Sequence, residues 1–292
     1  MSRTPRKLSV PLLAATLLLL LAACGSGSGA AAGSGADQKA AAQSGGLPGE
    51  HVHGVARDQG DGTVYLATHE GLFRYDKGAP VRVGPVVDWM GFSIAGPGHF
   101  YASGHPGDGV DLPAPVGLME TTDAGKTWSV RSLGGESDFH ALTSSSKGVL
   151  AYDGTLRSTA DGKTWTKLAI SAEPTSLAAA PDGSRILATT ASSVLLSSDQ
   201  GATWASLPAA PPLLLATWAD KTTATGVTTT GHLAVTTNTG ATWTTGTARV
   251  DSAQAISASR ADGGTLEVLL VTDSGVQRSI DSGASFSPLV TS

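Results

Sequence analysis

Histidines and carboxylates gather in the first half of the chain at spacings that suit metal or ligand binding. His51 and His53 are two residues apart, so in an extended strand their side chains point to the same side. His69 is followed directly by Glu70. The remaining members of this candidate metal- or ligand-binding set are Met90, His105 and His140. Imidazole and carboxylate groups suit zinc or another divalent first-row ion, and a methionine thioether would admit copper.

The same region also carries carboxylates that could do hydrolytic chemistry. A glycoside hydrolase needs two carboxyl groups about 5–9.5 Å apart across a cleft. The candidate catalytic carboxylates are Glu70, Asp88, Asp108, Asp111 and Asp153. A third interpretation stays open for all of these polar residues: they cap loop backbones at the opening of a channel and have no ligand.

A short sequence motif recurs five times between residues 121 and 286 and indicates the fold that positions these side chains. Each copy runs from Ser or Thr through an acidic or amide residue and Gly to a final aromatic residue, and the final aromatics are 37, 39, 39 and 43 residues apart. A period near 40 without a helical pattern is typical of a radially repeated all-β fold. The motif residues expected to be structural are Asp123, Gly125, Trp128, Asp199, Gly201, Trp204, Asp281 and Gly283.

Short β-rich runs separated by Pro, Asp and Gly surround every copy of the motif. Four strands in each unit and six units predict a single six-bladed β-propeller over residues 47–292. A sixth copy begins at residues 71–75, and its motif is shortened at residues 76–78. Seven blades are the alternative, because residues 104–116 form an insertion. Its three prolines disfavour a central strand, so we interpret it as a loop.

In such a propeller, the loops between second and third strands lie on the same face as the beginnings of the innermost strands. This topology places the candidate histidines and carboxylates on one face of the first three blades. Asp251 and Asp273 of the sixth unit belong to the same face, whereas His99 belongs to the opposite one.

The motif resembles the Asp-box, or BNR repeat, of sialidases, sortilin-type receptors and photosystem assembly-factor propellers. The resemblance covers residues 117–286 and implies a turn between the third and fourth strands of each blade. Asp and Ser/Thr side chains accept backbone N–H groups in a tight turn, Gly takes a positive φ, and Trp packs across the strands. Two copies depart from the pattern, with Ala160 at the Asp position of the second and Asn238 in the fourth. A turn tolerates such changes better than a catalytic or calcium-binding residue would, which favours a structural role.

A second resemblance covers residues 51–153. His-x-His-Gly, His-Glu-Gly-Leu and Gly-His-Pro segments are similar to those of exported bacterial Asp-box propellers that are often labelled glycosyl hydrolases. It implies a site on this face without naming its ligand. Sialidases use an arginine triad, and none converges here, so sialidase activity is not expected. Binding of a metal, a small ligand, a glycan or a surface protein, non-sialidase glycoside hydrolysis, and a protein assembly scaffold are the functions that remain.

The first 46 residues indicate export. Three basic residues precede an apolar run at residues 8–20 that is too short to span a bilayer, which is typical of a signal peptide over residues 1–23. Leu-Ala-Ala-Cys24 resembles a bacterial lipobox, which implies that Cys24 is lipidated and that the protein is anchored to a membrane, outside the cytoplasm. Residues 24–46 are rich in Gly, Ser and Ala and would form a flexible tether. The chain after the signal carries 16 basic and 24 acidic residues and no basic cluster, so nucleic-acid binding is not expected.

Overall fold

The computed structural model describes residues 46–75 and 80–289, and these residues form six four-stranded antiparallel sheets. The predicted signal peptide, the predicted lipidation site Cys24 and most of the predicted tether lie outside the described residues, as does the shortened motif at 76–78. No helix in the described part of the chain is long and apolar enough to cross a membrane.

The first three sheets, which we number as blades 1 to 3, follow one another along the sequence. Blade 1 consists of β1 (Val52–Arg57), β2 (Val64–Thr68), β3 (Gly71–Tyr75) and β4 (Val81–Val83). Blade 2 consists of β5 (Val87–Gly96), β6 (His99–Pro106), β7 (Leu118–Thr121) and β8 (Ser129–Ser132). Blade 3 consists of β9 (Ala141–Ser145), β10 (Gly148–Tyr152), β11 (Leu156–Thr159) and β12 (Thr166–Leu168).

Blades 4 to 6 repeat this order in the second half of the chain. Blade 4 consists of β13 (Pro174–Ala179), β14 (Ile186–Thr190), β15 (Val194–Ser197) and β16 (Ala205–Ser206). Blade 5 consists of β17 (Leu213–Trp218), β18 (Ala224–Thr228), β19 (His232–Thr236) and β20 (Thr244–Arg249). Blade 6 consists of β21 (Ala255–Arg260), β22 (Leu266–Thr272), β23 (Gly275–Ser279) and β24 (Ser287–Pro288), with a short 3₁₀ turn, η1 (Asp262–Gly264), between its first two strands.

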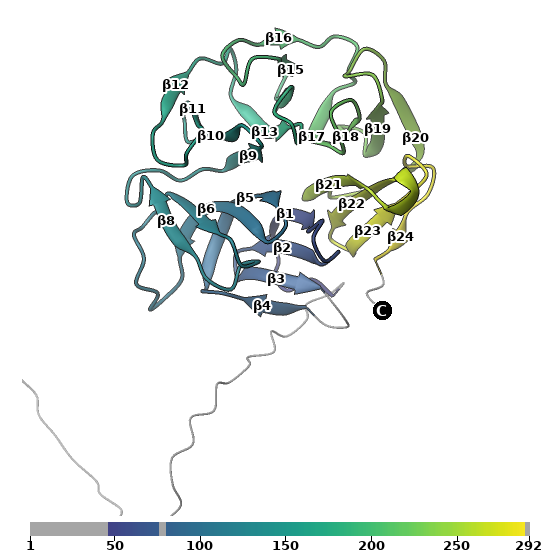
Figure 1. Ribbon diagram of the computed structural model, residues 1–292. Helices are drawn as coiled ribbons and strands as arrows, with labels where there is room; N and C mark the ends of the chain where they lie inside the picture. Colours follow the sequence, from purple (N-terminus) through teal and green to yellow (C-terminus); the bar gives the residue numbers. More distant parts are fainter. Residues whose placement is uncertain (1–45, 76–79, 290–292) are drawn as a thin grey trace, which may run out of the picture. The chain divides into compact units, whose positions relative to one another are not determined.

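The first strand of each blade lies at the centre of the molecule, and the six sheets radiate from there (Figure 1). Each of these inner strands contacts the inner strand of the next blade, and the circle closes where β1 meets β21. This is the predicted all-β propeller, and its six blades exclude the seven-bladed alternative for the described residues.

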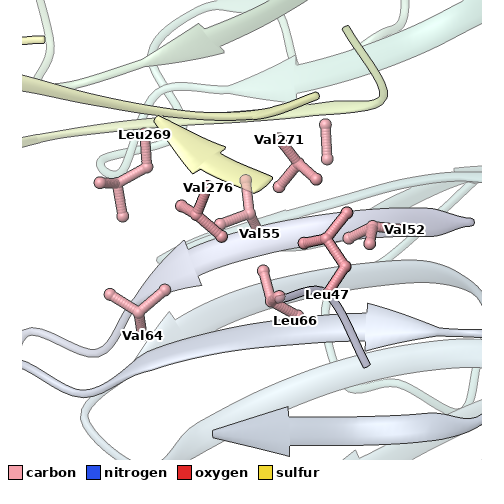
Figure 2. Close-up of a cluster of buried hydrophobic side chains, with 9 residues drawn as sticks. Leu47, Val52, Val55, Val64, Leu66, Leu269, Val271 and Val276 are labelled. Carbon is pink, nitrogen blue, oxygen red and sulfur yellow. The ribbon is translucent and has the colours of Figure 1, made fainter. Parts of the chain in front are cut away.

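Apolar side chains fill the space between every pair of neighbouring blades. Between blades 1 and 6 the cluster contains Val55 and Leu66 from one side and Leu269 and Val271 from the other, with Leu47 packed beside them (Figure 2). Successive side chains of a strand point to opposite faces, so Tyr65 and Ala67, on either side of Leu66, belong instead to the cluster between blades 1 and 2. The ring is therefore closed by side-chain packing between two complete sheets.

A buried ion cluster also joins blades 1 and 6. Glu267 of β22 is 3% exposed and accepts hydrogen bonds from Arg57 of β1 and Arg278 of β23. Burial alone would raise the pKa of Glu267, but the hydrogen bonds and charges of the two arginines outweigh it and lower that pKa. Nothing in the sequence motif pointed to this cluster.

The repeated motif forms the turn between the third and fourth strands of blades 2 to 6, as predicted. In blade 2, Thr121 donates to Asp123, and Asp123 accepts from both the backbone N–H and the hydroxyl of Thr127. The hydroxyl of Thr121 also accepts the N–H of Gly125, and Trp128 Nε1 donates to the carbonyl of Gly125 at 3.0 Å. The side chains of Thr121, Asp123, Thr127 and Trp128 thus all form hydrogen bonds within the turn, which is the behaviour of a scaffold.

Each turn also packs against the preceding blade. A Cβ added to Gly125 would lie 2.5 Å from Leu72 Cδ2 of blade 1, and Gly125 has φ +84°. Gly283 has φ +83°, and a Cβ added to it would lie 2.7 Å from Leu233 Cβ of blade 5. Glycine is therefore required at this position both for the backbone conformation and for the contact between blades.

The second copy of the motif differs from the prediction. We expected Ala160 at the Asp position, but Thr159 donates to Asp161, and Asp161 accepts the N–H and the hydroxyl of Thr164. The turn lacks the residue that separates Asp from Gly in the other copies, so Asp161 takes the motif position directly before Gly162. Asn238 in the fourth copy keeps the acceptor role through its side-chain oxygen.

The insertion in blade 2 is only partly a loop. Strand β6 continues through its first residues, so that Trp89 pairs with Gly104, Asp88 with His105 and Val87 with Pro106. Residues 107–117 contain no strand. The proline at residue 106 fits because it occupies the end of the strand, where its missing N–H removes no ladder bond further along.

Candidate metal and ligand site

Strands of blades 1 and 2 bring three of the predicted residues together. His53 lies in β1, His69 lies in the turn that joins β2 to β3, and Asp88 lies near the beginning of β5. Among the described residues, their ligand atoms lie within 4.8 Å of one another, so this group could hold a metal ion. It is the face on which the sequence placed these residues.

The two imidazoles face each other through their Nε2 atoms, which are 3.1 Å apart. Their rings are nearly perpendicular, at 84°, with centroids 4.7 Å apart. The ring of His51 packs on His69 in the same edge-to-face manner at 5.4 Å. Two Nε2 atoms this close either share one proton or direct two lone pairs to one point, so at least one of the two nitrogens is unprotonated.

Asp88 supplies negative charge to this group. Its Oδ1 lies 2.7 Å from Nδ1 of His69. Apart from this contact, Oδ1 is buried and has no hydrogen-bond partner in the described part of the chain. A buried carboxylate oxygen without a donor is costly, so this atom is available to a cation.

The environment favours the neutral form of His53. Burial is the largest cause that lowers its pKa, followed by the positive charge of His69, while Asp88 opposes the shift. The charges of His51 and His140 lower the pKa further. Neutral imidazole is the form that binds metals, so His53 needs little deprotonation at neutral pH to act as a ligand.

A second group lies beside the first and belongs to blades 2 and 3. Oδ2 of Asp138 is 2.9 Å from Nε2 of His105 and 2.6 Å from Nε2 of His140. Oδ1 of Asp138 is buried and has no hydrogen-bond partner among the described residues. Each imidazole is held by the carboxylate through one nitrogen, which leaves Nδ1 of each ring for another partner.

Close backbone packing places these two groups side by side. His105 follows Gly104, whose φ is +156°, and a Cβ there would lie 1.8 Å from the carbonyl oxygen of Asp88. His105 is the cross-strand partner of Asp88, so one strand pair of blade 2 carries one member of each group. Asp88 then contacts blade 1, and His105 contacts blade 3.

A central cavity of about 550 Å³ opens between the inner strands. His53, Met90 and His140 are among the residues that line it, together with small polar residues such as Thr175 and Ser257. Two of the predicted histidines and the predicted methionine therefore share one cavity. His51, His69 and His105 do not line it.

The other predicted carboxylates do not join these groups. Glu70, Asp108 and Asp111 are exposed. Asp153 is bound by Nε of Arg157 through both oxygens, at 3.1 Å each. Burial would raise the pKa of Asp153, but hydrogen bonds from Ser137 and Arg157 lower it, which does not favour proton donation at neutral pH.

Two residues that form contacts on this face, Asp138 and Gln254, were not among the predicted site residues. Asp138 holds two of the predicted histidines, and its place two residues before His140 is the signal that could have identified it. Gln254 accepts the N–H of Val52 and donates to Asp273, linking blades 1 and 6 at this face. An amide side chain in a turn gives no such signal in the sequence. His99 lies elsewhere, on Glu120, with Nε2 and Oε1 2.9 Å apart.

No protein-family model and no curated protein sequence matches this chain. Among solved structures, it resembles the GH74 enzyme of Niastella koreensis with 18% identity and a TM-score of 0.56, over 82% of this chain and 37% of that one. The chain thus spans well under half the length of that enzyme.

Two further structures match over most of both chains. Virginiamycin B lyase from Staphylococcus aureus has 12% identity and a TM-score of 0.56, over 82% of this chain and 85% of that one. YCF48 bound to D1 peptide has 14% identity and a TM-score of 0.51, over 82% of each chain. At these identities the likeness shows the fold alone, a β-propeller that carries unrelated functions in these proteins.

Proposed function

We propose that this protein is a membrane-tethered, extracytoplasmic propeller that binds a divalent first-row metal ion at His53, His69 and Asp88. The observation that carries the proposal is the 3.1 Å separation of the two Nε2 atoms. Two nitrogens bound to one tetrahedral zinc ion at about 2.0–2.1 Å lie roughly 3.3 Å apart, so the pair needs little movement to bind.

The charge of the group suits a divalent cation. Two neutral imidazoles and one carboxylate give a net charge of about −1 around the ion, a donor set common to zinc and copper(II) proteins. The buried Oδ1 of Asp88, which has no hydrogen-bond donor among the described residues, and the lowered pKa of His53 both favour binding of a cation over a proton. Three protein ligands leave coordination positions for water or a small ligand.

The tether is the part of the proposal that comes from the sequence. The basic residues, the apolar run and Cys24 would place a lipid anchor about 22 residues before the propeller. At 5–6 Å × √n, such a tether would let the propeller reach some 25 Å from the bilayer surface. The metal face would then be exposed to solutes and surface molecules outside the cytoplasm.

Metal content tests the proposal directly. The full-length chain, produced without a His-tag, is analysed by mass spectrometry before and after chelation and again after incubation with zinc or copper(II). We expect near-stoichiometric metal in the wild-type protein and its loss in the His53→Ala/His69→Ala variant.

The matched control is His99→Ala, which removes an imidazole bound to Glu120 away from the site. This variant should retain the metal. A wild-type protein that is isolated without metal and takes up none would overturn the proposal, as would equal metal content in both variants.

A further inference from the structure

The inner strands carry one equivalent position in each blade, just before the regular strand pairing begins. In blades 1, 2, 4 and 5 this residue is the extra one of a β-bulge, since the pairing register shifts across it. In blades 3 and 6 it directly precedes the first paired residue, Ala141 or Ala255. We call these six residues the inner ring: His53, Met90, His140, Thr175, Leu214 and Gln254.

A bulge redirects the side chain of its extra residue, and such bulges are common beside functional sites. All members of the inner ring except Leu214 line the central cavity. Leu214 instead is 47% exposed. Five of the six members of the inner ring therefore line the same cavity, each from a different blade.

Three consecutive members of the inner ring are metal donors. His53, Met90 and His140 offer nitrogen, sulfur and nitrogen, whereas threonine, leucine and glutamine in the other blades are poor ligands for transition metals. Met90 also differs from Met119, which is fully buried in the core between blades 1 and 2. Met90 is only partly buried and lines the cavity, so filling the core does not account for it.

A hydrogen bond to a carboxylate orients one of the two histidines for metal binding. Nε2 of His140 is held by Asp138 at 2.6 Å, the carboxylate–imidazole arrangement that orients metal-binding histidines and leaves Nδ1 as the donor. His53, Met90 and His140 lie in or directly before three successive inner strands, and all three line the same cavity. The described part of the chain contains no cysteine that would compete for a soft metal, because the one cysteine is Cys24.

We propose that His53, Met90 and His140 form a copper(I) site in the central cavity that they line. A thioether with two imidazoles is a soft donor set that favours Cu(I) over zinc, calcium or magnesium. The ion is bound as Cu(I) and released as Cu(I), so no electron is transferred. This inference rests on the proposed metal-binding function, because His53 belongs to both sites. Occupancy by Cu(I) and occupancy by a divalent ion at His53, His69 and Asp88 therefore exclude each other.

The test is an anaerobic competition titration of the full-length chain against a chromophoric Cu(I) chelator, with parallel zinc titrations. The decisive variant is Met90→Leu, which approximately conserves volume and removes only the sulfur. We expect the Cu(I) affinity of this variant to be at least about tenfold lower than that of the wild type, with zinc affinity unchanged. His140→Ala should have the same effect, and His99→Ala should have none.

A second measurement does not depend on affinity. With the methionine methyl groups ¹³C-labelled, silver(I), a redox-inert substitute for Cu(I), should shift the Met90 signal and leave the Met119 signal in place. Met90→Leu should remove the shifted signal.

The outcomes separate the two proposals. Unchanged Cu(I) affinity in Met90→Leu, or no shift of the Met90 methyl, overturns the copper(I) site and leaves the divalent site standing. Parallel loss of Cu(I) and zinc binding in Met90→Leu would show a general disturbance and also overturn the copper(I) site. A wild-type chain that binds neither ion would overturn the proposed function itself.

Discussion

Arg57 in the first blade donates a hydrogen bond from Nε to Oε2 of Glu267 in the sixth blade, at 2.7 Å. The two residues are 210 positions apart in the chain and join blades 1 and 6, the same two blades that the apolar cluster of Figure 2 joins. Glu267 is 3% exposed, so its charge depends on Arg57 and Arg278 for compensation.

Glu267→Gln should destabilise the protein strongly, because it leaves Arg57 and Arg278 beside a neutral side chain between blades 1 and 6. Breaking a buried ion pair by removing one member costs about 3–5 kcal/mol. Thermal unfolding followed by circular dichroism measures the effect. The control is Asp251→Asn, which removes an exposed ion pair with Arg249 and should leave Tm almost unchanged. Equal Tm values for both variants would show that Glu267 does not stabilise the contact between blades 1 and 6.

The carboxylates of the repeated turns should make the fold sensitive to acid. The N–H and hydroxyl of Thr127 lower the pKa of Asp123 from 3.8 to about 2, and Ser285 does the same for Asp281. A lowered pKa in the folded state contributes stability above the unfolded pKa, and this contribution is lost as the pH falls through the folded pKa. Stability measured by urea unfolding should therefore decrease from about pH 4 towards pH 2. A stability that is flat over this range would contradict the assignment.

Asparagine should replace aspartate in these turns at little cost. Asn238 already accepts from Thr236 and Thr242 and donates to the hydroxyl of Thr242. We expect Asp123→Asn to unfold within about 2–4 °C of the wild type. Asp123→Ala loses the acceptor and should unfold at a lower temperature than Asp123→Asn. The reverse order in a melting experiment would mean that the carboxylate charge matters more than the acceptor geometry.

Gly91 and Gly96 offer a matched pair within β5. A Cβ on Gly91 would lie 2.3 Å from the carbonyl oxygen of Phe139, whereas a Cβ on Gly96 would meet nothing within 4 Å. Gly91→Ala should force β5 away from blade 3 and lower Tm by several degrees, and Gly96→Ala should be nearly neutral. Differential scanning calorimetry distinguishes them, and equal Tm values would show that the inner strands have room to separate.

Zinc should stabilise the protein if the proposed site binds it. A ligand at 100 times its dissociation constant raises the free energy of unfolding by about 2.7 kcal/mol. The Tm of the wild type should therefore rise with added zinc, and that of His53→Ala/His69→Ala should not. An equal rise in the double variant would place the binding elsewhere.

The repeated motif made the fold predictable. Its spacing located the third and fourth strands of five blades, and the intervening Gly- and Asp-rich turns located the others. The prediction was wrong at Asp161, because loss of one residue between Asp and Gly leaves a sequence that can be aligned in two ways. It was also wrong at His105, which belongs to β6: a strand that ends in proline looks like a loop in the sequence.

The face of the site was predictable, but its contacts were not. Topology alone placed His53, His69 and Asp88 at one end of the inner strands. The approach of His53 to His69, in contrast, depends on a bulge in β1 that no residue type specifies. The contact of His105 with Asp138 joins blades 2 and 3 across 33 positions of the chain, and no local pattern specifies such a contact.

The closure of the ring by side chains has a consequence for how the chain can be rearranged. Every sheet is built from four consecutive strands, so a break in any connection between blades would leave all six sheets intact. Leu47 belongs to the apolar cluster between blades 1 and 6, and Leu289 packs against the same cluster. The two ends of the described fold therefore lie close together. A short covalent link between them, with new ends opened between other blades, should give a circular permutant that folds to the same propeller. The ring of six blades should therefore form whichever blade is synthesised first.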